Sequence, residues 1–87
     1  MVSFMDRIHS PEALGSTLRE ARKRLALTQS ELALAAGVGL RFVVDLERGK
    51  PTVRLEQVLR VIDALGGVVL LEGLSYSPPH GKQGSES

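Results

Sequence analysis

Apolar residues recur at helical spacing in four stretches of this chain, and residues that start or stop helices bound each stretch. In the first stretch, Ser10-Pro11-Glu12 combines a capping hydroxyl, a proline where no N–H is needed and a carboxylate near the positive end of the helix dipole. Gly15 is expected to weaken this helix locally. The helix is predicted to run to about residue 25, with an apolar stripe made of Leu14, Leu18, Ala21 and Leu25.

The second helix has the clearest start signal in the sequence. Thr28 and Glu31 have the spacing of a capping box, in which the threonine hydroxyl accepts from the N–H of Glu31 and the glutamate carboxylate accepts from the N–H of Thr28. A helix is therefore predicted to begin at Gln29. Gly37, which can adopt the left-handed conformation that closes a helix, predicts its end about two turns later.

A third helix is predicted after a short hinge. Gly39 occupies its cap position, and Gly49 is expected to stop it. Val43 and Leu46 are three residues apart and should point toward the core, with Phe42 extending the buried edge. The opposite side should carry Leu40, Arg41, Val44 and Asp45. Two short helices joined by a glycine-bounded turn predict a helix-turn-helix motif.

A fourth helix is predicted after the loop at residues 50–52, with Thr52 as its N-terminal cap. Gly66 and Gly67 are expected to end it. Its apolar stripe is formed by Leu55, Val58, Leu59, Ile62 and Leu65.

The residues that follow, VVLLE at 68–72, are too few for a helix and too apolar to leave one face in water. Backbone donors and acceptors need partners, and a lone strand in a helical chain has no sheet to join. We therefore expect a strand that pairs with the same strand of a second copy, which also covers an edge that would otherwise aggregate. The strand residues are Val68, Val69, Leu70 and Leu71.

The pattern as a whole predicts an all-α fold. A compact body of four to five helices at residues 10–66 contains the helix-turn-helix motif, between an N-terminal arm at 1–9 and the dimerisation strand at 67–74. Residues 75–87 are rich in Pro, Gly and Ser and are predicted to form a disordered tail. An 87-residue chain makes one domain with a small core, and such chains often gain stability by dimerising.

The composition constrains the chemistry and cellular location of the protein more than it identifies a binding partner. The chain has no cysteine, which excludes disulfides, Cys-type zinc sites and thiolate chemistry. No stretch approaches the roughly 18–20 apolar residues of a membrane span, and the start of the chain does not resemble a signal peptide, so a cytoplasmic protein without membrane contact is expected. The net charge is +1, yet nine basic residues stand against five acidic ones between Arg19 and Arg60. This local excess permits nucleic-acid binding without requiring it.

Catalysis is not expected. The two histidines, His9 and His80, lie near one terminus and in the tail, and their spacing does not fit a metal pair. Asp45 and Glu47 are two residues apart, so on a helix their carboxylates point in different directions. Because no candidate nucleophile has an evident base, we expect neither enzyme activity nor a cofactor.

The segment TQSELALAAGVG…DLERGK resembles the Cro/C1-type (XRE) helix-turn-helix family over residues 14–65. More narrowly, the SPEALG start, the four-helix body and the apolar strand after it resemble the HipB-type antitoxins. That resemblance implies a homodimeric DNA-binding repressor of its own operon, which also binds a HipA-like Ser/Thr kinase toxin. Its DNA partner would be a palindromic double-stranded operator.

The resemblance also implies roles for individual residues. Gln29 lies at the first turn of the second helix, where exposed amides attract a phosphate. Arg41 is the best candidate for reading guanine through O6 and N7, although it could instead contact a phosphate or water. Leu40 and Val44 would contact thymine methyl groups, and Asp45 would either accept from cytosine N4 or orient Arg41. The other implied phosphate contacts are Thr28, Arg48, Lys50 and Arg54.

Two further positions gain a structural meaning from the family. An arginine late in the first helix, here Arg22, pairs with the glutamate of Glu-x-Gly, here Glu47, and locks the third helix against the first. Gly39 departs from the family, which usually has Ser or Thr there, and loses a capping hydroxyl.

Other functions remain open from the sequence. A phage-type or restriction–modification controller regulator would share the motif without a toxin partner. A protein-interaction module could use the Leu40 and Val44 face for a partner helix instead of DNA. The salt dependence of binding distinguishes the protein-interaction module from a DNA-binding protein, because affinity for DNA should fall steeply as the salt concentration rises.

Overall fold

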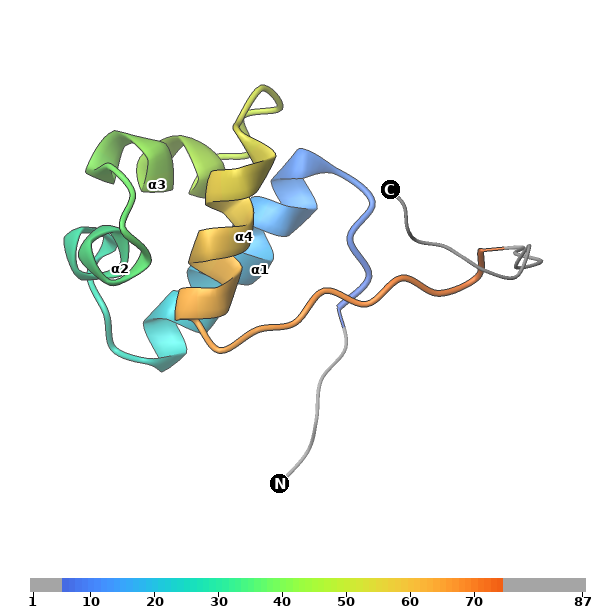
Figure 1. Cartoon of the computed structure of the whole chain (residues 1–87), viewed down its shortest axis with the longest axis horizontal. Helices are drawn as coiled ribbons and strands as arrows, with labels where there is room; N and C mark the ends of the chain where they lie inside the picture. Colours follow the sequence, from blue (N-terminus) through green and yellow to red (C-terminus); the bar gives the residue numbers. More distant parts are fainter. Residues whose placement is uncertain (1–5, 75–87) are drawn as a thin grey trace, which may run out of the picture.

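A computed structural model describes residues 6–74 of the 87-residue chain. Its four helices are α1 (Pro11–Arg24), α2 (Gln29–Ala36), α3 (Leu40–Glu47) and α4 (Leu55–Ala64). Helices α1 and α2 both pack against α3, and α2 also packs against α4 (Figure 1). The predicted compact helix-turn-helix body is thus confirmed, with four helices. The predicted tail at 75–87 and the first five residues of the predicted arm lie outside the described residues.

Helix α1 starts as predicted but ends at Arg24, one residue before the predicted end. The Ser10 hydroxyl accepts from the N–H of Ala13 at 3.0 Å and caps the helix. At the other end the helix stops at Arg24, because Ala26 takes a left-handed conformation with φ of +57°. Leu25 is 52% exposed, so its predicted place in the buried stripe is wrong.

The boundaries of α2 follow the predicted signals. Thr28 Oγ1 accepts from the N–H of Glu31 at 3.0 Å, and the N–H of Thr28 donates to Glu31 Oε1 at 2.8 Å, which completes the capping box. Gly37 closes the helix in the left-handed conformation with φ of +70°. The hinge that follows leads directly into α3, whose N-cap residue, Gly39, makes no side-chain capping bond.

Helix α4 corrects two predictions. It begins at Leu55 with Arg54 as its N-cap, so Thr52 does not cap it. The buried side of the helix carries Val58 and Val61, and the predicted stripe missed Val61. Its outer members point to solvent, since Leu55 is 69% and Leu59 47% exposed. The reason is that the buried arc of a helix is narrow, and these two leucines lie past its edge.

The core lies where the four helices meet. Four side chains at its centre are almost completely inaccessible: Leu32, Val43, Leu46 and Val61. Phe42 and Val38 pack half-buried against this cluster, as part of the helix-turn-helix motif. The inward orientation predicted for Val43 and Leu46 is therefore confirmed.

Two glycines allow α1 to lie directly against the end of α3. A Cβ added at Gly15 would meet the main-chain oxygens of Leu46 and Glu47, the latter at 2.8 Å. A Cβ added at Gly49 would lie 2.9 Å from the Cα of Glu12. Gly15, which the sequence marks only as a weak point of the helix, is thus a position where two helices lie in close contact.

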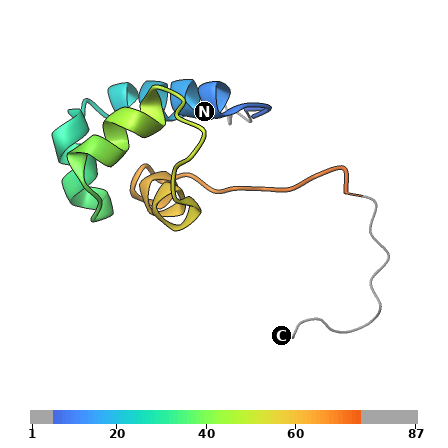
Figure 2. The same ribbon diagram turned by 90° about the horizontal axis from the view of Figure 1, so that it is seen from above.

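Residues 67–74 leave the helical body as an extended segment (Figure 2). Among the described residues, 6–74, none forms a strand, so the strand predicted at 68–71 is not formed within the single chain. Its four apolar side chains are 53–78% exposed. A strand needs a ladder partner, and pairing with a second copy stays a prediction. No helix in the described part of the chain has the length and apolar character to cross a membrane.

Candidate nucleic-acid interface

The two faces of α3 differ sharply in burial. Val43 and Leu46 fill the core on one face. On the other, Leu40 is 48% exposed and the side chain of Arg41 is 78% exposed, both in the first turn. Val44 and Asp45, one turn later, are half-buried. The start of α3 is therefore presented to solvent while the same helix is held from behind.

Three of the predicted contact residues form a cluster on this exposed face. Arg41 Nε lies 3.3 Å from Asp45 Oδ1, and Lys50 Nζ lies 3.7 Å from Asp45 Oδ2. The carboxylate is the least exposed member, with 18% of its side chain accessible. The first pair follows from i, i+4 spacing on a helix. The second requires the chain to turn back at Gly49, which has φ of +86°, and no pattern in the sequence indicated this contact.

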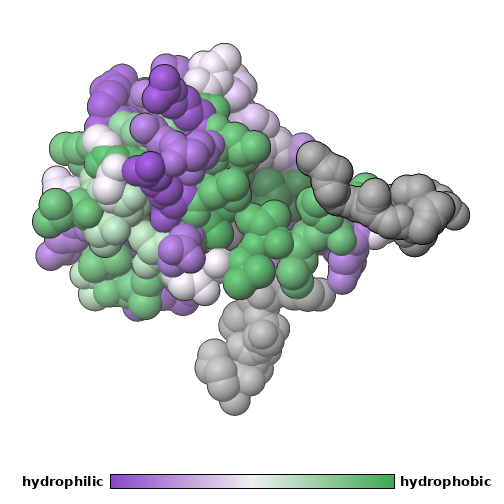
Figure 3. Space-filling model, in the orientation of Figure 1, coloured by the Kyte–Doolittle hydropathy of each residue, from purple (hydrophilic) through white to green (hydrophobic). Residues whose placement is uncertain are grey.

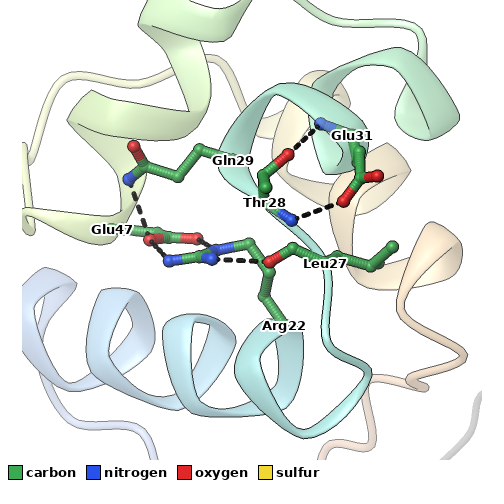
Figure 4. A network of polar contacts seen from close by, with 6 residues as sticks. All are labelled: Arg22, Leu27, Thr28, Gln29, Glu31 and Glu47. Carbon is green, nitrogen blue, oxygen red and sulfur yellow. Dashed lines mark hydrogen bonds and ion pairs between the residues drawn. The ribbon is translucent and has the colours of Figure 1, made fainter.

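Behind this face, a buried ion pair joins α1 to the end of α3 (Figure 4). Arg22 donates from Nε to Glu47 Oε2 at 2.7 Å and from Nη2 to Glu47 Oε1 at 3.0 Å. Arg22 Nη1 also donates to the main-chain oxygen of Leu27 at 2.8 Å. Hydrogen bonding to the Glu47 carboxylate raises the pKa of Arg22 above its ordinary value, burial of the guanidinium opposes this shift, and the attraction of the opposite charge adds a smaller upward contribution.

The start of α2 is tied into the same network. Gln29 Nε2 donates to Glu47 Oε1 at 3.1 Å, the oxygen that also accepts from Arg22 (Figure 4). The Gln29 side chain is therefore held over the last turn of α3. Thr28 is exposed, and its hydroxyl accepts the hydrogen bond of the capping box. Both predicted phosphate contacts thus sit at a helix start that is fixed relative to α3.

The remaining predicted residues are less closely connected. Arg48 and Arg54 are exposed, at the C-cap of α3 and the N-cap of α4, and neither joins an ion pair within residues 6–74. The same part of the chain holds no group of three or more acidic or histidine side chains that could bind a metal ion. The site presents an exposed helix start with exposed cationic side chains, which suits a polyanionic surface.

The arrangement of α2, hinge and α3 is that of an XRE-type helix-turn-helix protein. The sequence profile described as "Helix-turn-helix" matches residues 18–68, which is more than half of the chain. The chain therefore belongs to the helix-turn-helix family, as a transcriptional regulator of the XRE type.

Two curated relatives carry corresponding names. The HTH-type transcriptional regulator y4mF of Sinorhizobium fredii (strain NBRC 101917 / NGR234) is 53% identical over 60 residues, which cover 69% of this chain and 79% of the relative. An HTH-type transcriptional regulator of Methanothermobacter thermautotrophicus (strain ATCC 29096 / DSM 1053 / JCM 10044 / NBRC 100330 / Delta H) is 43% identical over 49 residues, or 56% of this chain and 71% of that protein.

Solved structures agree on the fold. A chain of the HipA-HipB-O2-O3 complex superposes with a TM-score of 0.72 at 24% identity, over 77% of this chain and 94% of that one. A HipB-O4 20mer complex gives the same values. The clp gene regulator ClgR from C. glutamicum has a TM-score of 0.63 at 38% identity, over 74% of this chain and 82% of ClgR.

Proposed function

We propose that this regulator binds a palindromic duplex operator as a homodimer and represses transcription, with the first turn of α3 in the major groove. The observation that carries the proposal is the division of α3 into a buried face and an exposed N-terminal turn bearing Leu40 and Arg41. Recognition helices of this motif read base edges from their first residues. The half-sites would lie about one helical turn, roughly 34 Å, apart.

Within the groove, Arg41 reads a guanine and the apolar side chains read thymine. The guanidinium has the donor geometry to bind guanine O6 and N7 together. Leu40 and Val44 lie on the same side of the helix and would meet thymine methyl groups. Asp45 belongs to the same face of α3.

Phosphate contacts would flank this helix. The start of α2 places backbone amides near Gln29, and helix starts attract anions because of the partial positive charge there. Basic side chains after α3 would hold the other side of the groove. The proposed phosphate-contacting residues are Thr28, Gln29, Arg48, Lys50 and Arg54.

The second copy would join through the extended segment. Figure 3 shows hydrophobic surface over α4 and along the segment that follows it. Val68 and Leu71 are each 78% exposed, and Leu59 on α4 is 47% exposed. Contiguous apolar surface of this kind marks an interaction site in soluble proteins. Pairing of residues 68–71 with their copy would satisfy the backbone and cover these side chains at once.

We further propose that the protein is the antitoxin of a two-gene operon, with a HipA-like Ser/Thr kinase toxin as partner. Support comes from the HipB fold at a TM-score of 0.72 and from the apolar segment after α4. A stand-alone regulator is the second candidate, because the 38% identity to the clp gene regulator ClgR exceeds the identity to HipB.

DNA binding is tested by fluorescence anisotropy with the duplex upstream of the protein's own gene and a random duplex of equal length. We expect tight binding to the first only, with affinity falling log-linearly with salt by about 0.9 per phosphate contact. Arg41→Ala should weaken the specific complex by about 1–3 kcal/mol and relax base preference at one position. Arg7→Ala is the matched control, since it removes the same charge from the segment before α1, which lies away from α2 in Figures 1 and 2.

Equal affinity for the two duplexes would refute operator binding, and a flat salt response would favour a protein-interaction module. If Arg41→Ala weakened both complexes equally, Arg41 would be a phosphate contact. The toxin partnership is tested by co-expression with the product of the adjacent open reading frame, followed by co-purification. A complex with a kinase-like protein supports the antitoxin, and the absence of any complex supports the stand-alone regulator.

A further inference from the structure

The carboxylate of Asp45 is engaged from both sides in the free protein. Its Oδ1 lies 3.3 Å from Arg41 Nε and its Oδ2 lies 3.7 Å from Lys50 Nζ. Its side chain is only 18% exposed, against 78% for Arg41 and 51% for Lys50. A carboxylate so placed has little surface left for a base and stands between two cations that reach further out.

The contact with Arg41 leaves the base-reading end of the guanidinium available. The closest approach of the carboxylate is to Nε, the nitrogen nearest the side-chain stem. A guanidinium has five N–H donors, four of them on the terminal nitrogens. These terminal donors can therefore meet guanine O6 and N7 while Nε stays on the carboxylate.

We infer that Asp45 is a positioning residue that sets the base specificity of Arg41, and that it does not itself read a base. This inference rests on the proposed DNA binding through α3. Asp45 holds the arginine in an orientation suited to guanine, so less side-chain freedom is lost on binding. Ordering one long side chain corresponds to about 0.5–1.5 kcal/mol, or roughly a two- to tenfold change in affinity. Lys50, on the other oxygen, keeps the carboxylate in place.

A second effect follows from charge. The negative charge of Asp45 offsets part of the positive charge of Arg41 and Lys50, which otherwise attracts the phosphates of every sequence alike. Asp45 therefore lowers binding to random DNA while it raises binding to the guanine-containing site. Removing its charge should change the two affinities in opposite directions, which a purely structural role would not do.

The experiment compares Asp45→Asn, Asp45→Ala, Arg41→Ala and the double variant Arg41→Ala/Asp45→Asn. Affinity is measured for the site selected from a random duplex library, for that site with each base pair replaced in turn, and for random duplex. We expect both Asp45 variants to lose about two- to tenfold of the guanine preference at the position that Arg41 reads, and to bind random duplex more tightly. In the Arg41→Ala background, Asp45→Asn should change base preference no further.

Asp63→Asn is the matched control, because Asp63 is an exposed aspartate on α4 with the same charge and side chain. It should leave base preference unchanged. The inference is overturned if Asp45→Asn alters preference at a base pair that Arg41→Ala leaves unaffected, which would make Asp45 a base reader. It is also overturned if the two substitutions act additively.

A measurement without DNA separates this inference from the proposed function. In the free protein, the Arg41 Nε–H signal in ¹⁵N-edited NMR should shift and lose order in Asp45→Asn, and remain unchanged in Asp63→Asn. If wild-type protein shows no sequence preference at all, the proposed function fails, while the NMR result still reports on the contact. An Arg41 signal insensitive to Asp45→Asn would refute the positioning role.

Discussion

Replacing Gly15 with alanine sets two effects of opposite sign against each other. In an exposed helix the change would stabilise the protein by about 0.8–1 kcal/mol, because glycine is a poor helix former. In this fold the added Cβ meets the main-chain oxygens of Leu46 and Glu47. Its distance to the Glu47 oxygen is 2.8 Å, about 0.6 Å short of the 3.4 Å at which ordinary contact begins.

The neighbouring atoms cannot rotate away, because they belong to the backbone of the last turn of α3. Helix α1 would have to move off α3, and the same movement would stretch the hydrogen bonds between Arg22 and Glu47. Overpacking of this kind costs about 1–3 kcal/mol or more. Packing therefore outweighs helix propensity, and we expect Gly15→Ala to be destabilising by about 1–2 kcal/mol net.

The assay is thermal and urea unfolding followed by circular dichroism at a single protein concentration. A loss of 1 kcal/mol lowers the Tm of a domain of this size by about 4–8 °C. Ser16→Ala is the control: Ser16 is the next residue on α1 and is exposed, so alanine there should raise stability by a few tenths of a kcal/mol. A Gly15→Ala protein as stable as wild type, or more so, would refute the close contact between α1 and α3.

Two further predictions concern the buried ion pair and the contact with a second copy. Arg22→Met should destabilise the fold by about 3 kcal/mol in urea unfolding, because the Glu47 carboxylate, with 2% of its side chain exposed, then has no cation beside it. The double variant Arg22→Met/Glu47→Leu should recover much of the lost stability, and an Arg22→Met protein as stable as wild type would refute the stabilising role of the ion pair. Val69→Pro should remove a ladder donor and weaken self-association in sedimentation without loss of helical signal, whereas a full-strength dimer would show that residues 67–74 are not the interface.

Local signals in the sequence were sufficient where one side chain and the nearest backbone decide the structure. The Ser10 cap, the Thr28 and Glu31 capping box and the left-handed Gly37 all involve partners within three or four residues. These boundaries are therefore visible without the fold. Thr52 has the same capping chemistry but lies in a loop whose path is set by packing, and the helix starts three residues later.

Positions at the margin of a helix face could not be assigned from periodicity. Leu25 and Leu59 fit the helical spacing as well as Leu18 does, yet only Leu18 is buried. Which margin is covered depends on where neighbouring helices lie and on whether the chain turns, as it does at Ala26. The significance of Gly15 is of the same kind, because it depends on a backbone more than thirty residues away along the chain.

The site was predictable only through resemblance and helical spacing. Arg22 and Glu47 are 25 residues apart, and no local pattern joins them. The Arg41 and Asp45 pair follows from spacing, but the contact of Lys50 depends on the backbone at Gly49. The sequence therefore left open whether Asp45 reads a base or orients Arg41. The conformation of Gly49 affects this question because it brings Lys50 to the Asp45 carboxylate.

An eight-residue helix such as α3 is too short to be stable alone, so its direction is set by what holds it. Glu47, at its last position, accepts from Arg22 of α1 and from Gln29 at the start of α2 through the same oxygen, Oε1. The Glu47 carboxylate thereby helps to fix the start of α2 relative to α3, the two helices proposed to contact DNA. Because Glu47 is buried, it does not itself lie at the DNA surface. Because about 9 Å of helix separates Glu47 from Arg41, the angle of α3 at its buried end determines the position of Arg41.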